Sequence, residues 1–173
     1  MTIHREHPFD TPDDDRDPVR RLRGRIGGTV SLWTSGDGID RAGLTVSSYL
    51  VATGEPGRVV GLLHADSDLL EQLEETGTAV VALLGIGDQR LADVFAGVMP
   101  APGGAFRLIE WEQTAWGPRP SHATTWLGVR LDPASRHDVG WSVLVEAVIE
   151  HAEVGGEDAP LVHRRGRYQR PAD

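Results

Sequence analysis

The sequence predicts a mainly β protein of the α+β class, in which a β-barrel carries a few short helices. About seven or eight short segments are apolar or alternate between apolar and polar residues, as strands do. Only two or three short segments repeat apolar residues at helical spacing. Because many short strands separated by turns favour closed or curled sheets, we expect one barrel domain.

The first expected hairpin occupies residues 29–49. Residues 29–34 alternate, which places Val30 and Leu32 on one face of a strand and Trp33 on the other. The stretch S-G-D-G-I-D at residues 35–40 contains an Asp-Gly step, which is typical of hairpin turns. Residues 42–49 then return as the partner strand.

The expected helices are short. A helix is predicted from about Asp68, because Asp68 and Glu71 have the spacing of a capping box, and Gly77 is a natural end. A second helix is predicted at residues 89–96. The remaining expected strands are residues 59–64, which are nearly all apolar and predict full burial, and residues 78–84, 106–113, 124–131 and 142–150.

The chain has 173 residues, and 39% of them are hydrophobic, which fits one globular domain. Residues 1–17 are acidic and punctuated by proline, so we expect a disordered tail before a domain at residues 18–170. Asp17 and Pro18 could open a helix as N-cap and first residue. An apolar run long enough for a membrane span or a secretory signal is missing from the sequence, which makes the cytoplasm the expected location.

Composition excludes several kinds of chemistry. The sequence contains no cysteine, so disulfides, thiolate catalysis and iron–sulfur clusters are excluded. All 17 basic residues are arginine, which excludes a lysine Schiff base and the lysine of a P-loop. The net charge of −9 argues against nucleic-acid binding, and the histidine spacings predict no metal site. Any phosphate must therefore be bound by arginine, histidine, hydroxyl or backbone N–H groups.

The segment A-G-L-T-V-S-S-Y at residues 42–49 concentrates hydrogen-bonding groups at a strand end. Two adjacent hydroxyls and small side chains would let a planar polar ligand approach the backbone. The alternative is an ordinary strand followed by a serine-containing turn. The pattern of a hydrolase nucleophile elbow, G-x-S-x-G, does not occur here.

Six segments in order resemble the flavin reductase-like family of split-barrel FMN-binding proteins. They span roughly residues 20–170 and include G-L-T-V-S-S, a short helix ending F-A-G, and a late P-L-x-x-x-x-G-R-Y segment. The segments are residues 29–34, 43–48, 59–67, 78–84, 95–97 and 160–168. The resemblance implies a split β-barrel that binds FMN, or FAD, without a covalent bond.

By this resemblance, the flavin would lie along Thr45, Val46, Ser47 and Ser48. Its phosphate would lie at the junction of residues 64–68, where Ser67 is the first candidate ligand and His64 and Arg41 are weaker ones. The alternative for this junction is helix capping alone. Near the C-terminus, His163, Arg165 and Tyr168 are candidates at the flavin mouth, while a solvated, charged edge is the alternative.

One motif departs from the family pattern. Members carry G-D-H before a late strand, whereas an alignment without gaps places Trp141 and Ser142 after Gly140 here. A shifted alignment would retain His137 instead. In the alignment without gaps the family histidine is missing, which weakens the case for reduction by NAD(P)H.

The resemblance implies a homodimeric NAD(P)H-dependent flavin reductase that passes reduced flavin to oxygen, to a second flavin or to a partner oxygenase. A flavin-binding sensor or storage protein without reductase activity is the first alternative, favoured by the missing histidine. A deazaflavin-binding or haem-binding protein with the same barrel is another. The tryptophans Trp33, Trp111 and Trp126 are expected in the core or at a dimer contact.

Overall fold

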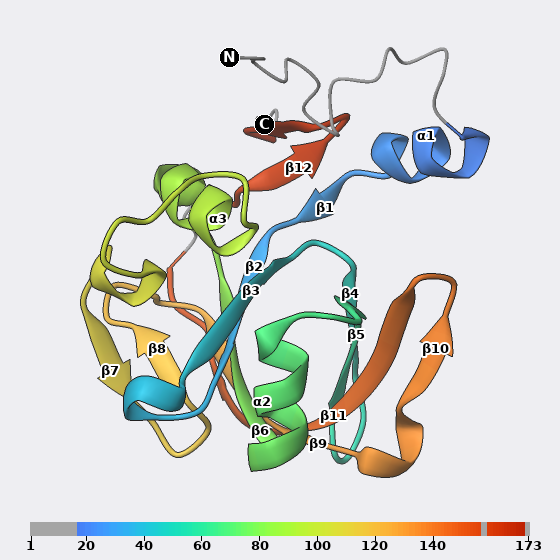
Figure 1. Cartoon of the computed structure of the whole chain (residues 1–173). Coiled ribbons are helices and arrows are strands. Elements are labelled where there is room, and N and C mark those ends of the chain that lie inside the picture. The colour runs from blue at the N-terminus through green and yellow to red at the C-terminus, as the bar shows by residue number, and fades with distance from the viewer. Residues whose placement is uncertain (1–16, 157–158, 172–173) are drawn as a thin grey trace, which may run out of the picture.

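The computed structural model describes residues 17–156 and 159–171. Its main element is one curled sheet with strand order β3-β2-β6-β9-β11-β5-β4, to which β10 adds by pairing with β11 (Figure 1). The paired strands are antiparallel throughout this sheet. The strands are β2 (Ser31–Ser35), β3 (Ala42–Val46), β4 (Tyr49–Ala52), β5 (Arg58–His64), β6 (Thr78–Leu83), β9 (Trp126–Leu131), β10 (His137–Val139) and β11 (Ser142–Glu153).

Among the described residues, two small sheets and three α-helices surround this half-barrel. One sheet contains β1 (Gly28–Thr29), β12 (Val162–Arg164) and β13 (Arg167–Gln169), and the other pairs β7 (Trp111–Gln113) with β8 (Pro118–Pro120). The helices are α1 (Pro18–Arg25), α2 (Asp68–Thr76) and α3 (Gln89–Phe95). Figure 1 shows α1 and the β12–β13 hairpin at the same end of the molecule, beyond the barrel.

The core has two main parts, separated by β2. Trp33 points into the barrel, where it packs with the leucines of α2, and Leu32 points into a second cluster that includes α3. Both side chains are fully buried, which confirms their expected placement on opposite faces. A Cβ at Gly61 would lie 2.8 Å from the Trp33 ring, so glycine at this position makes room for the indole.

The helix ends agree with the sequence in two places and differ in a third. The Asp17 carboxylate accepts a hydrogen bond from Val19 N–H (3.4 Å), and Pro18 is the first residue of α1, as expected. Gly77 ends α2 in the left-handed conformation, with φ of 71°. The cap of α2 is Ser67 rather than Asp68, because the Ser67 hydroxyl accepts the N–H of Leu70 (3.2 Å).

Several strand predictions were wrong. The expected strand at residues 106–113 begins only at Trp111, because residues 105–107 form a 3₁₀ helix whose Phe106 carbonyl accepts the Trp111 indole N–H (2.9 Å). Strand β5 is not fully buried: Leu62 is 36% exposed, since one face of this strand lies outside the core.

The first expected strand is divided at Val30. Its N–H donates to Leu161 and its carbonyl accepts from Leu84, so β1 pairs with β12 whereas β2 belongs to the main sheet. The hairpin from β2 to β3 is confirmed, but residues 38–40 form a 3₁₀ helix in place of a two-residue turn.

The expected acidic tail lies outside the described residues, apart from Asp17. None of the helices in the described ranges has the length and apolar character needed to cross a bilayer.

Candidate functional site

The link between β3 and β4 consists of Ser47 and Ser48, both partly exposed. The Ser48 carbonyl accepts the N–H of Leu62 (2.9 Å), which joins this link to β5. Within residues 17–156 and 159–171, the N–H groups of Ser47 and Ser48 donate to no protein acceptor. Unpaired N–H groups at a strand end are available to a ligand with acceptor atoms.

Small side chains and hydroxyls surround the link. A Cβ at Gly28 would lie 2.8 Å from the Ser47 carbonyl oxygen, so only glycine lets β1 pass this closely. The Thr29 and Tyr49 hydroxyls lie 3.0 Å apart in a hydrogen bond. Burial raises the pKa of Tyr49, which keeps its hydroxyl protonated at neutral pH. We call the group formed by Gly28, Thr29, Ser47, Ser48 and Tyr49 the mouth.

Thr45 and Val46, which precede the link, have side chains engaged inside the protein. The Thr45 hydroxyl donates to the carbonyl of Ala92 (2.7 Å), and Val46 is 3% exposed in the barrel core. Both residues can therefore meet a ligand only through the strand backbone.

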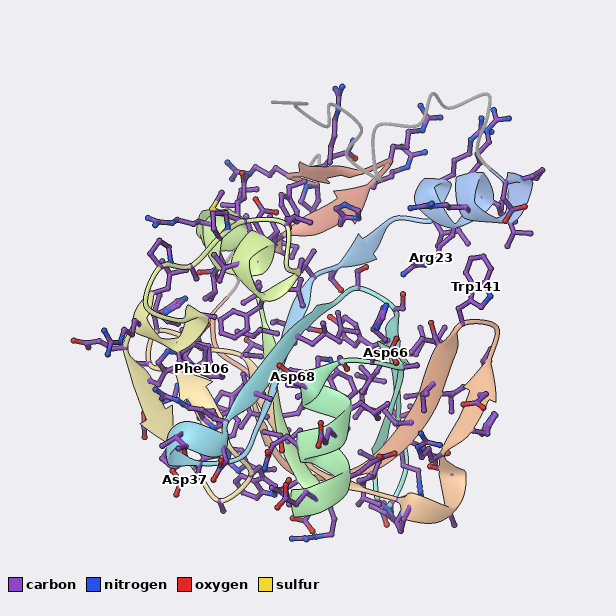
Figure 2. The ribbon with its side chains drawn as sticks, viewed as in Figure 1. Arg23, Asp37, Asp66, Asp68, Phe106 and Trp141 are labelled. Carbon is purple, nitrogen blue, oxygen red and sulfur yellow. The ribbon has the colours of Figure 1, made fainter. Side chains whose placement is uncertain are left out.

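Arg23 reaches the mouth from α1, and Figure 2 shows its side chain on the barrel side of that helix. Its Nη2 donates to the Ser48 hydroxyl oxygen at 3.0 Å. The β12–β13 turn fixes α1 from the other side, because Arg165 N–H donates to the Gly24 carbonyl (2.7 Å) and Arg164 Nε donates to the Arg25 carbonyl (3.2 Å).

His163 and Tyr168 are partners across the β12–β13 ladder, and their rings meet edge to face with centroids 5.5 Å apart. The Tyr168 hydroxyl donates to Asp93 Oδ1 (2.8 Å). Burial and this bond raise the pKa of Tyr168. Burial lowers the pKa of His163, and the positive charge of Arg23 lowers it further, so this imidazole is neutral at pH 7.

The β5–α2 junction presents an acidic helix start. The Ser67 hydroxyl donates to the His64 carbonyl (2.8 Å) while it caps α2, so both of its hydrogen-bonding roles are used within the protein. His64 Nδ1 accepts the N–H of Asp66 (3.2 Å). Asp66 and Asp68 flank Ser67 (Figure 2), which disfavours a phosphate at this helix end.

Arg41 lies at the opposite end of β3 from the mouth. The strand separates it from Ser47 by roughly 20 Å at the usual rise per residue. Its guanidinium instead covers the ring of Phe106, at 4.6 Å from the ring centroid. Arg41 was one of the weaker candidates for the phosphate, and the extended strand β3 separates it from the mouth.

The β10–β11 turn carries Trp141, which is 96% exposed. The next residue, Ser142, pairs directly with His64 on β5. Strand β11 thus brings Ser142 beside the β5–α2 junction. His137 lies on β10, where its Nδ1 is 2.9 Å from the Ser135 carbonyl.

Most of the predicted site residues thus gather at one end of the barrel, and Arg41 does not. Sequence reasoning missed three contributors: Arg23, Thr29 and Tyr49. Tyr49 ends the segment that was singled out, so its hydroxyl was visible in the pattern. Nothing local marks Arg23, which meets Ser48 across 25 residues of chain.

A family model for the flavin reductase like domain matches residues 23–172. The chain belongs to this family. The curled antiparallel sheet with few helices is the split-barrel type of fold that the family resemblance implied.

Similar proteins include the FMN reductase (NADH) RutF 1 of Methylorubrum extorquens (strain PA1). It is 25% identical over 155 residues, which cover 90% of this flavin reductase-like chain and 76% of the relative. The NADH:FAD oxidoreductase SgcE6 of Streptomyces globisporus C-1027 has a similar structure, with a TM-score of 0.80, 22% identity, and coverage of 94% of this chain and 96% of that one.

A third similar structure is BorF, the flavin reductase component of a bacterial two-component tryptophan halogenase. Its TM-score is 0.76 at 22% identity, and the match covers 90% of this chain and 99% of BorF. At 22% identity, the two structural matches establish the fold of this chain but not its reaction. The reaction must be argued from the residues at the mouth.

Proposed function

We propose that this protein is an NAD(P)H-dependent flavin reductase that binds its flavin at the mouth. Family membership supports the reaction class. The observation that carries the location is the Ser47–Ser48 link, where two N–H groups without a protein acceptor and two hydroxyls lie beside the cationic Arg23.

The groups at the mouth fit the polar edge of a flavin. That edge has acceptors at O2, O4 and N5 and a donor at N3. The N–H groups of Ser47 and Ser48 supply donors, and the Ser47 carbonyl supplies an acceptor. Thr45 and Val46 would contribute through the backbone, since their side chains are engaged in the interior.

A bound flavin supplies the ring that accepts a hydride from the nicotinamide and passes the electrons on. The chain's own part is to orient that ring by hydrogen bonds and to set the local charge. His163 stays neutral at pH 7 because burial and Arg23 lower its pKa. The positive charge that contacts the link is therefore that of Arg23, which donates to the Ser48 hydroxyl. The site is therefore suited to an anionic ligand.

FMN is the flavin that we propose, and FAD is the alternative. RutF 1 is named for FMN and SgcE6 for FAD. Of the candidate phosphate ligands, His64, His163 and Arg165 lie at the correct end of the barrel. The Ser67 hydroxyl is already hydrogen-bonded to the His64 carbonyl and to the Leu70 N–H. Arg41 lies at the other end of β3, where its guanidinium covers Phe106.

We also propose a homodimer located in the cytoplasm. The edge strand β4 exposes Leu50 (76%) and Val51 (54%), α1 exposes Val19 and Leu22, and Ile26 is exposed just after its end. Apolar side chains at a sheet edge favour contact with a second copy of the chain. By analogy with BorF, the reductase component of a two-component halogenase, a partner oxygenase or halogenase is the expected consumer of reduced flavin.

A flavin-binding protein without reductase activity is the second candidate. It is favoured by Trp141 and Ser142, which the alignment without gaps matches to the Asp-His of the family pattern.

The experiment that separates the two candidates is anaerobic reduction of the FMN-loaded protein. We expect NADH or NADPH to bleach the flavin absorbance within the time of enzymatic turnover. If FMN binds but neither nucleotide bleaches it, while dithionite does, the protein binds flavin without being a reductase. If no flavin binds at all, both candidates fail.

A further inference from the structure

We propose that Arg23 is the phosphate-binding residue of the mouth, supplied by α1 and oriented by Ser48. This inference rests on the proposed flavin site and adds a residue that neither the motifs nor the expected site included. The shared chemistry is a guanidinium paired with a phosphate monoester or diphosphate, and FMN is the first expected source of that phosphate.

The contact with Ser48 places the positive charge of Arg23 directly at the link. Arg23 Nη2 lies 3.0 Å from the Ser48 hydroxyl oxygen. Within residues 17–156 and 159–171, Arg23 forms no ion pair with a carboxylate. Its remaining guanidinium N–H groups are therefore available to an anion, and planar donors of this kind suit phosphate oxygens.

The surroundings of Arg23 are also positively charged. The positive charge of Arg23 helps to lower the pKa of His163. Arg164 and Arg165 hold the backbone of α1 at Arg25 and Gly24, which brings further guanidinium groups to the same end of the molecule. Such a concentration of arginine in a chain of net charge −9 is stabilised by an anionic ligand.

The position of α1 is set by these contacts rather than by burial, since α1 has no buried residue. Arg23 thus reaches the mouth through a helix that is joined to the β12–β13 hairpin by one backbone hydrogen bond and one from the Arg164 side chain. Ser48 then acts on the phosphate through Arg23, as a positioning residue, in addition to the flavin contact proposed for its backbone.

The test compares Arg23→Gln with the native protein for binding of FMN and of riboflavin, which lacks the phosphate. We expect FMN affinity to fall about 10-fold to 100-fold, as for a lost charge-assisted hydrogen bond, with riboflavin affinity unchanged. The control is Arg25→Gln, which removes the same charge from an exposed position on the same helix. Arg23→Lys should retain part of the FMN preference because it keeps the charge without the planar donors.

A second arm measures KM for NADPH and NADH with riboflavin as the electron acceptor. An FMN-specific loss assigns Arg23 to the flavin phosphate, and a loss confined to NADPH or NADH assigns it to the dinucleotide phosphate. Equal losses for FMN and riboflavin with unchanged KM values, or no loss in either arm, would overturn the role of Arg23 while leaving the flavin site intact. A native protein that binds neither flavin would overturn the proposed function itself.

Discussion

Ser142 and His64 lie directly opposite each other on the neighbouring strands β11 and β5. Side chains paired in this way in an antiparallel sheet project from the same face, with Cβ atoms about 5 Å apart. His64 accepts the N–H of Asp66 through Nδ1, so its neutral ring carries the proton on Nε2. His64 thus places an imidazole beside Ser142, the residue that the alignment without gaps matches to the family histidine.

This pairing predicts that Ser142→His increases reductase activity. The family resemblance implies that this histidine lies near the flavin and the nicotinamide. An imidazole at residue 142 would add a hydrogen-bond donor there, worth about 3-fold to 10-fold in the rate of anaerobic flavin reduction. Stopped-flow measurement of flavin bleaching checks this result. Ser121→His, on an exposed residue outside the mouth, is the control. An unchanged rate in a folded variant would mean that the turn does not approach the nicotinamide.

Ser67 provides a second prediction, because capping and phosphate binding have different consequences. Ser67→Ala removes the acceptor of Leu70 N–H and should lower the free energy of unfolding by about 1 kcal/mol, with FMN affinity unchanged. Ser67→Asp keeps a capping oxygen and adds a negative charge, so both stability and FMN affinity should stay near the native values. A severe loss of FMN binding in Ser67→Asp would restore Ser67 as a phosphate ligand.

The pKa of His163 gives a test of the Arg23 position that requires no ligand. Burial first, and then the charge of Arg23, lower this pKa from its ordinary value of 6.5. Arg23→Gln should therefore shift the His163 titration upward in an NMR experiment, whereas Arg25→Gln should shift it less. If the two variants gave the same titration curve as the native protein, Arg23 would not lie near this ring.

The same lowered pKa makes folding depend on pH. The unfolded chain takes up a proton on this imidazole more readily than the folded one does. The contribution of His163 to stability is therefore complete above the unfolded pKa of about 6.5 and is lost as the pH falls toward the folded pKa. Denaturant titrations of the native protein and His163→Gln between neutral and mildly acidic pH should converge as this contribution is lost.

Gly61→Ala should destabilise the barrel. A Cβ at this position would lie 2.8 Å from the fully buried Trp33 ring, so the indole or the strand must shift. Overpacking of this kind costs about 1–3 kcal/mol, measurable by denaturant unfolding. Gly87→Ala is the matched control, because a Cβ there meets nothing within 4 Å. Equal stability of the two variants would contradict the close packing of Trp33 on β5.

The parts of the fold that follow from local chemistry could be predicted. The cap at Asp17, the end of α2 at Gly77 and the hairpin from β2 to β3 each depend on a few adjacent residues. The segment around Phe106 could not be predicted. Its apolar residues pack on the second core cluster from a 3₁₀ helix and irregular backbone, although their sequence resembles that of a strand. Apolar composition indicates that a segment is buried, but it does not show which backbone conformation the segment adopts.

The candidate site divides in the same way. Ser47 and Ser48 could be predicted as binding residues because the two hydroxyls and the strand end are adjacent in sequence. Arg23 was not, since its contact with Ser48 depends on how α1 is held by the β12–β13 turn. Arg41, a weaker phosphate candidate, lies at the other end of β3 from Ser47, because an extended strand separates residues that are close in sequence.

A crystal structure of the protein with FMN would show directly whether the flavin binds at the mouth. We expect the flavin ring against the backbone of residues 45–48, with at least one polar edge atom within hydrogen-bonding distance of the Ser47 or Ser48 N–H, and the phosphate paired with Arg23. A flavin bound elsewhere on the barrel, with the Ser47–Ser48 link exposed to solvent, would contradict it.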